Sequence, residues 1–106
     1  MLRILRNDMK SHVAVLNLEG RIDGEWAEVL QDECLALFLR GRRVVLDLSG
    51  VDFIGRSGIH ALICLVWAGA GIVGCTPLIA DVLAHEGIEV TRNLQPSDDG
   101  NFSKSN

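Results

Sequence analysis

Twenty consecutive residues, 61–80, carry no charged side chain in a chain of 106 residues. An uncharged run of this length is long enough to cross a bilayer as one helix. Its second half, however, contains residues that interrupt a helix or begin a new one: Gly69, Gly71, Gly74, Thr76 and Pro77. Because glycine and proline disfavour helix interiors, the run predicts the end of one helix, a short buried strand and the start of another helix. We therefore expect no membrane span.

The periodicity of hydrophobic residues predicts the strands and helices in the rest of the chain. Alternating or continuous apolar runs predict strands, and apolar residues at helical spacing predict helices. The expected strands cover 2–4, 12–18, 44–48, 72–75 and 88–90, and the expected helices cover 24–39, 57–68 and 77–86. The resulting order, β-β-α-β-α-β-α, predicts an α/β fold in which helices pack on a small mixed sheet of four to five strands.

Composition narrows the functional classes. The chain is expected to form one domain over 1–94, followed by a polar and flexible tail over 95–106. A net charge of −4 argues against nucleic acid as the main partner, because phosphate neutralisation needs a basic surface. The three cysteines are too few and too scattered for a disulfide framework, so we expect small buried thiols in a reducing cytoplasm.

The motifs that would indicate an enzyme or a cofactor site lack their structural context. Residues 69–74 match Gly-x-Gly-x-x-Gly, but a helix precedes them where a dinucleotide site needs a strand. His12, His60 and His85 do not cluster with cysteines or carboxylates at metal-ligand spacing. The sequence has no Gly-x-Ser-x-Gly nucleophile motif. We therefore expect no catalytic activity, no metal and no cofactor.

Side chains that can cap a helix stand at each expected helix start. Asp23, Ser57 and Thr76 can accept a hydrogen bond from first-turn N–H groups, and Pro77 follows Thr76 at a position that tolerates proline. Ser57 also follows a buried strand and a glycine-containing loop. A hydroxyl at a helix N-terminus is a favourable phosphoacceptor, because the helix dipole and free N–H groups stabilise a phosphate there. Ser57 is therefore both an expected cap and a candidate phosphorylation site.

Three segments resemble the STAS domains, which are named after sulfate transporters and anti-sigma factor antagonists. The most specific segment is 44–58 (VVLDLSGVDFIGRSG), and residues 18–23 and 76–77 also match. The resemblance covers roughly 12–90 and implies a STAS-like fold and a protein-interaction domain without catalytic activity. It also implies that Ser57 is the serine that a partner kinase phosphorylates, and that phosphorylation releases the partner.

The resemblance assigns further roles around Ser57. Gly58 matches the glycine after the phosphoacceptor, and Asp23 matches an acidic loop residue near the site. Gly55 and Arg56 depart from the family pattern, in which an aspartate and a first serine are expected at these positions. The stretch from 57 to 77 is also shorter than in most members, which indicates an abbreviated variety of the domain.

The helix expected over 57–68 is apolar on all sides, so it is expected to be buried on more than one side. On a helical wheel its core-facing residues are Ile59, Leu62, Ile63 and Val66. The opposite face carries His60, Ala61, Cys64 and Ala68. We expect this opposite face to dock a partner helix or a second protomer. The full set of expected partner-binding residues is Asp23, Gly55, Arg56, Gly58, His60, Ala61 and Cys64.

Three functions are compared. The leading one is a bacterial cytoplasmic regulator of transcription that resembles an anti-sigma factor antagonist, binds an anti-sigma factor or a serine kinase-like protein, and is switched at Ser57. The alternative is a constitutive scaffold or accessory subunit, of the stress-signalling or lipid-transport type, in which Ser57 is only a helix cap. The third, a small enzyme or nucleotide binder, lacks a convincing set of residues.

Overall fold

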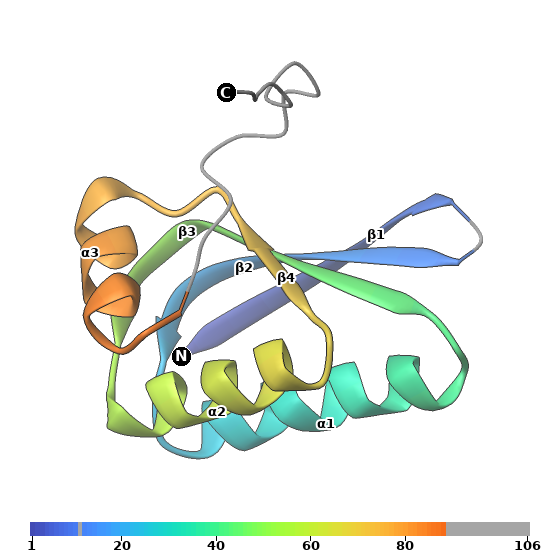
Figure 1. The fold of residues 1–106 in the computed structure, drawn as a ribbon, viewed down its shortest axis with the longest axis horizontal. Helices are drawn as coiled ribbons and strands as arrows, with labels where there is room; N and C mark the ends of the chain where they lie inside the picture. Colours follow the sequence, from blue (N-terminus) through green and yellow to red (C-terminus); the bar gives the residue numbers. More distant parts are fainter. Residues whose placement is uncertain (11, 89–106) are drawn as a thin grey trace, which may run out of the picture.

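The computed structural model describes residues 1–10 and 12–88 (Figure 1). Its elements are β1 (Leu2–Lys10), β2 (Val13–Ile22), α1 (Glu25–Leu39), β3 (Arg43–Ile54), α2 (Arg56–Trp67), β4 (Gly71–Val73) and α3 (Pro77–His85). This order confirms the predicted alternation of strands and helices. Ile88 lies outside any strand, and the rest of the strand expected at 88–90 falls outside the described residues, as does the tail expected over 95–106.

The described strands form one mixed sheet in the order β1-β2-β3-β4. β1 pairs antiparallel with β2, whereas β2, β3 and β4 run parallel. β1 continues through 5–10, beyond the strand expected at 2–4. Two further strands are longer than the sequence pattern predicted, since β2 continues through 19–22 and β3 through 49–54. Both extensions pass register shifts, and Val51 and Ile54 are buried at irregular spacing there, which hid the strand from a test of strict alternation.

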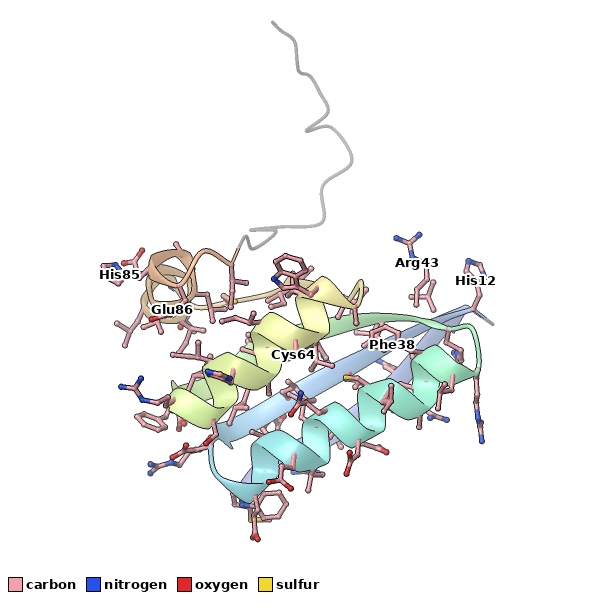
Figure 2. The ribbon with its side chains drawn as sticks, turned by 60° about the horizontal axis from the view of Figure 1, so that its bottom comes forward. His12, Phe38, Arg43, Cys64, His85 and Glu86 are labelled. Atoms are coloured by element: carbon pink, nitrogen blue, oxygen red, sulfur yellow. The ribbon has the colours of Figure 1, made fainter. Side chains whose placement is uncertain are left out.

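α1 and α2 lie side by side on one face of the sheet (Figures 1 and 2). That face supplies the core, and its fully covered strand residues are Ala14, Leu16, Leu18, Val44, Leu46 and Leu48. On the opposite face the side chains of Val13, Val15 and Asn17 in β2 and of Val45 and Asp47 in β3 are only half-buried, and two of them are polar. There the Asn17 Nδ2 atom donates to Asp47 Oδ2 at 3.1 Å, and the Ser49 N–H donates to Asp47 Oδ1 at 2.9 Å. The sheet is thus packed by helices on one face, as its alternating burial indicates.

The helix starts differ from two of the three predictions. α1 begins after Gly24 and α2 after Gly55, and neither has a side-chain cap, so Asp23 and Ser57 are not the N-caps that the sequence predicted. In α3 the prediction is confirmed, because Thr76 Oγ1 accepts from the Ile79 N–H at 3.4 Å. At the first start Gly24 adopts a positive φ of 56°, whereas Gly55 at the second has ordinary extended backbone and is in contact with Asp23.

The orientation of α2 corrects the helical wheel. The buried residues are Gly58, Ala61, Leu62 and Leu65, and the exposed face carries His60, Cys64, Trp67 and Ala68. Ala61 is only 1% exposed, so its placement on the outer face was wrong. Gly58 must face the sheet, since a Cβ atom there would overlap the carbonyl oxygen of Ile22, and Ala61 follows one turn later on the same side. Among the described helices, none has the length and apolar character to cross a membrane.

Candidate functional site

The N-termini of α1 and α2 meet at one edge of the sheet. They do so because both helices follow the carboxyl ends of adjacent parallel strands, β2 and β3. The Gly55 N–H donates to the Ile22 carbonyl oxygen at 3.0 Å, which ties the start of α2 to the end of β2. Charged and polar residues near the two helix starts are therefore brought together from distant parts of the sequence.

The end of β2 and the start of α2 pack tightly at Asp23, Gly55 and Gly58. A Cβ atom on Gly55 would overlap Asp23 Oδ1, so the half-buried Asp23 side chain lies directly against the Gly55 backbone. A Cβ atom on Gly58 would overlap the Ile22 carbonyl oxygen. In this chain the space beside the Gly55 backbone is thus occupied by the Asp23 side chain.

An open hollow of about 520 Å³ lies between the first turns of α1 and α2. Its lining residues are Gly24, Ala27, Glu28, Gln31, Arg56, Ser57 and His60. The structure therefore brings Arg56, Ser57 and His60, three of the residues that the sequence proposed for the site, together on one exposed surface. Glu28 and Gln31 of α1 were missed, because the helical wheel of α2 alone does not show which helix lies beside it.

Ser57 is exposed as the second residue of α2. The first hydrogen bond of the helix runs from the Ile59 N–H to the Gly55 carbonyl oxygen at 2.9 Å. Earlier N–H groups of a helix have no carbonyl partner within it, so this end favours an anion. The exposed Arg56 side chain adds a positive charge next to the Ser57 hydroxyl. The arrangement can hold an anionic group, and Ser57 is accessible to a modifying enzyme.

The remaining predicted residues lie elsewhere. Ala61 is buried beneath α2 and contributes nothing to the surface. Cys64 is exposed and lines a second hollow of about 310 Å³ farther along the same two helices. The expectation of three buried thiols is confirmed only for Cys34, since Cys75 is half-buried. Within 1–10 and 12–88, no group of three or more metal-binding side chains occurs.

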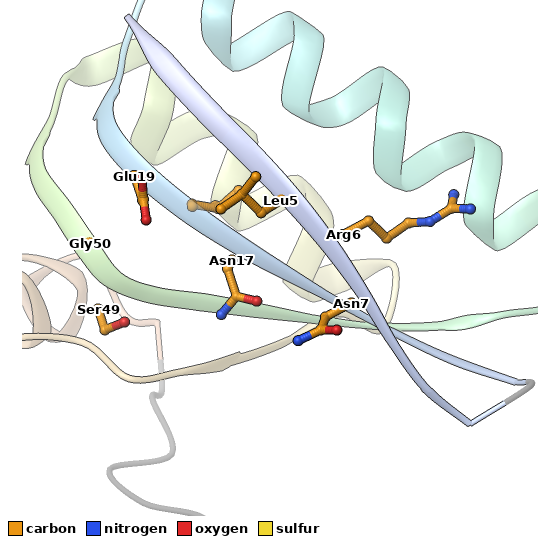
Figure 3. A pocket seen from close by; sticks show the side chains of 8 residues that line it. Leu5, Arg6, Asn7, Asn17, Glu19, Ser49 and Gly50 are labelled. Atoms are coloured by element: carbon orange, nitrogen blue, oxygen red, sulfur yellow. The ribbon is translucent and has the colours of Figure 1, made fainter.

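A third hollow of about 460 Å³ lies away from α1 and α2 (Figure 3). Its lining includes Asn7 and Leu5 of β1, Asn17 and Glu19 of β2, and Ser49 of β3. Asn17 donates to Asp47, and Asp47 also accepts from the Ser49 backbone. The first of these hydrogen bonds joins β2 to β3 and the second lies within β3, so we interpret the polar residues here as part of the sheet.

Comparisons with known proteins agree with the fold and with the sequence resemblance. The family model described as "Mlab, STAS domain" matches residues 5–94. The chain is similar to a solved anti-sigma factor antagonist from Mycobacterium paratuberculosis, at 26% identity and a TM-score of 0.71, covering 82% of this chain and 79% of that one. No curated protein matches the chain.

Two further solved structures share the fold. One is the anti-sigma factor antagonist SpoIIAA in its unphosphorylated form, at 12% identity and a TM-score of 0.66, covering 91% of this chain and 93% of that one. The other is the Bacillus cell fate determinant SpoIIAA in the phosphorylated form, at 15% identity and a TM-score of 0.64, covering 80% of this chain and 84% of that one.

Proposed function

Because the chain belongs to the STAS domain family, we propose that it is a non-catalytic regulatory binding domain whose partner surface is centred on Ser57. Phosphorylation of Ser57 switches this surface, and the unphosphorylated form binds the partner. The observation that carries the proposal is the exposed Ser57 hydroxyl in an open hollow at the start of α2. The domain extends over 1–94 and acts in a bacterial cytoplasm.

The physical basis of the switch is local. A phosphate adds about 1.5–2 negative charges at neutral pH. On Ser57 it would occupy the hollow beside Arg56 and would be stabilised by the first-turn N–H groups of α2. A partner group seated in the hollow would be displaced by both the volume and the charge of the phosphate. The partner is an anti-sigma factor or a serine kinase-like protein, a proposal that the similarity to anti-sigma factor antagonists supports.

A second candidate is a constitutive scaffold or accessory subunit. It is favoured by Arg56, which places a cation directly before the acceptor where the STAS pattern has a serine. In that case the same surface binds its partner permanently, and Ser57 contributes only an exposed hydroxyl.

The two functions differ in the fate of Ser57. The domain is recovered by affinity capture from its native cells, and its intact mass is compared with that of Ser57→Ala. A mass increase of one phosphate that Ser57→Ala abolishes supports the switch, whereas an unmodified mass under all growth conditions contradicts it.

Partner binding gives the second measurement. Ser57→Asp is expected to reduce capture of the native partner about tenfold or more, since the added carboxylate brings volume and negative charge into the hollow where the partner group sits. Ser49→Asp is the matched control, because Ser49 is also exposed but lies on β3, in the hollow away from α1 and α2. Equal capture by wild-type, Ser49→Asp and Ser57→Asp proteins favours the constitutive scaffold.

A further inference from the structure

The hollow around Ser57 continues as a groove between α1 and α2. The second hollow is lined by Gln31, Asp32, Leu35, Phe38, Cys64, Leu65 and Ala68, and it shares Gln31 with the first. Figure 2 labels Cys64 on α2 and Phe38 on α1, the helices that form its two walls. We call the two hollows together the α1–α2 groove. Its lining changes from polar at the Ser57 end to apolar at the far end.

We propose that the α1–α2 groove seats an amphipathic helix of a partner protein whose polar flank is basic. The proposal deepens the binding function assigned above by giving the partner segment its chemistry, and it rests on that function only for the identity of the partner. Charge, shape and exposure each contribute to it.

One large apolar side chain in the far wall of the groove is exposed, and two more follow it on the same helices outside the lining of the groove. Leu35 in its wall is 55% exposed, and Leu39, one turn later on α1, is 80% exposed. Trp67, one turn after Cys64 on α2, is 87% exposed. Clustered exposed apolar side chains of this kind mark sites of protein–protein contact, and tryptophan is among the residues that contribute most at interfaces.

The α1 wall of the groove carries only negative charge, and Arg56 at the start of α2 is the one cation in the lining of the two hollows. α1 contains Glu25, Glu28, Asp32 and Glu33, and it has no lysine or arginine. Glu28 and Asp32 lie one turn apart in the groove wall, whereas α2 contributes no acidic residue. A partner helix in the groove would therefore face α1 with one side, and that side would lie next to the carboxylates of Glu28 and Asp32. Lysine or arginine on that side is complementary, and acidic residues there would be repelled.

A second copy of this chain does not fit the same surface. A two-fold interface would place the same patch of both copies together. It would enclose four carboxylates from Glu28 and Asp32 of the two copies against only two Arg56 guanidinium groups. The surface is also concave in each copy, so two such grooves would leave unfilled space between them. A convex basic helix satisfies both the charge and the shape.

The length of the groove sets the length of the helix. Its α1 wall extends from Gly24 to Phe38. At 1.5 Å rise per residue this span is about 21 Å, which is the length of a helix of roughly four turns. Apolar anchors at positions i, i+3 or i+4, and i+7 would reach the apolar end, as in other complexes of a helix in a groove.

The test uses a synthetic peptide of leucine and lysine, roughly five turns long, with the leucines on one helical face. A leucine–glutamate peptide of the same pattern and a leucine–lysine peptide of scrambled order are the matched probes. Binding is measured by anisotropy of a labelled peptide and by the emission of Trp67, which should shift to shorter wavelength when the helix covers it. Trp67→Phe should abolish that shift, because the other tryptophan, Trp26, is already packed against the core.

Two pairs of variants locate the binding. Asp32→Lys is expected to weaken binding of the basic peptide about tenfold, while the neighbouring Glu33→Lys, which makes the same charge change outside the groove, changes it less than about twofold. Leu35→Glu is expected to weaken binding about tenfold, and Leu78→Glu on α3, where the leucine is 69% exposed, is the matched apolar control. Unfolding curves of all four variants establish that each is folded.

The proposal is overturned if the basic peptide binds no better than the acidic or scrambled one, or if Asp32→Lys and Glu33→Lys weaken it equally. It is also overturned if sedimentation shows a dimer that Leu35→Glu dissociates, because a second copy would then occupy the groove. The phosphorylation state of Ser57 is measured separately by mass. If the peptide binds and Ser57 is never phosphorylated, the groove proposal stands and the phosphorylation switch is contradicted. If Ser57 is phosphorylated and the peptide does not bind, only the switch stands.

Discussion

Gly58 lies where the backbone of α2 comes closest to the end of β2. A Cβ atom there would overlap the Ile22 carbonyl oxygen, which is backbone and cannot move aside like a side chain. We predict that Gly58→Ala lowers the free energy of unfolding by about 1–3 kcal/mol, the range for overpacking a close contact. Urea unfolding followed by circular dichroism measures this difference.

Gly71→Ala is the control for this substitution. A Cβ atom on Gly71 would meet only a methyl group of Val45, at 4.0 Å, which is ordinary van der Waals contact. It should therefore leave the unfolding midpoint close to that of the wild type. Equal destabilisation by both variants would show that the loss of glycine itself, and not the contact with Ile22, determines the effect.

Cys34 lies on the buried face of α1, and its thiol resists ionisation. Burial, reinforced by the charge of Glu33, raises the pKa of Cys34 from 9.0 to about 12. Between pH 9.0 and about 12 the unfolded chain binds fewer protons than the folded one, so the free energy of unfolding falls as the pH rises through this window. Below pH 9 the contribution of the protonated Cys34 thiol to stability is fully present. By about pH 10.5 the expected loss is about 2 kcal/mol.

Comparison with Cys34→Ala isolates this thiol from other groups that titrate at high pH. The variant is less stable at pH 8 because it leaves a cavity, but the stability gap to the wild type should narrow by about 2 kcal/mol at pH 10.5. A gap that stays constant over this pH range would show that the Cys34 thiol titrates alike in the folded and unfolded chains.

At the scale of single elements, the starts of α3 and α2 differ in the role of their hydroxyl side chain: Thr76 caps its helix, whereas Ser57 does not. Thr76 Oγ1 accepts from the Ile79 N–H, so we predict that Thr76→Ala lowers the free energy of unfolding by about 1 kcal/mol. Ser57 makes no cap hydrogen bond and is exposed, so Ser57→Ala should change it by less than about 0.5 kcal/mol. Thermal unfolding of both variants provides the test, and a larger loss for Ser57→Ala would contradict these roles.

The sequence predicted each element where a local signal exists. The α3 start was correct because Thr76 and Pro77 form a cap that acts within one turn. The starts of α1 and α2 were predicted at the wrong residues. Gly24 acts at the first start through its positive φ, and Gly55 acts at the second through its contact with Asp23. No local sequence pattern shows either effect. The buried face of α2 was misplaced for the same reason, since it depends on which backbone lies opposite Gly58.

At the scale of the whole molecule, stability is expected to be uneven. β2 and β3 are bonded on both sides in the sheet, and Leu16 and Leu46 within them are fully buried. α3 is a helix of nine residues with only two buried side chains. We predict that hydrogen exchange is slowest for the amides of β2 and β3 and distinctly faster for α3, because α3 can open without unfolding the sheet.

Native-state exchange followed by NMR measures this order directly. Opening free energies for α3 equal to those of β2 would contradict the prediction and would show that the fold opens only as a single unit.

The candidate site also belongs to this scale. Fold class and the position of Ser57 were accessible from periodicity and from the resemblance of 44–58, because these signals lie within continuous segments. Glu28 and Gln31 were not accessible, since their place beside Ser57 depends on the parallel pairing of β2 with β3. Pairing of distant segments leaves little trace in a single sequence.

The antiparallel course of β1 has a practical consequence. It returns residue 1 to the edge of the sheet where α1 and α2 begin, and the Arg21 N–H donates to the Met1 carbonyl oxygen at 3.0 Å. An affinity tag placed before Met1 would therefore emerge close to the Ser57 hollow and compete with whatever binds there. The opposite end of the sheet, where β2 and β3 begin, is the better attachment point for a fluorophore or an immobilising linker.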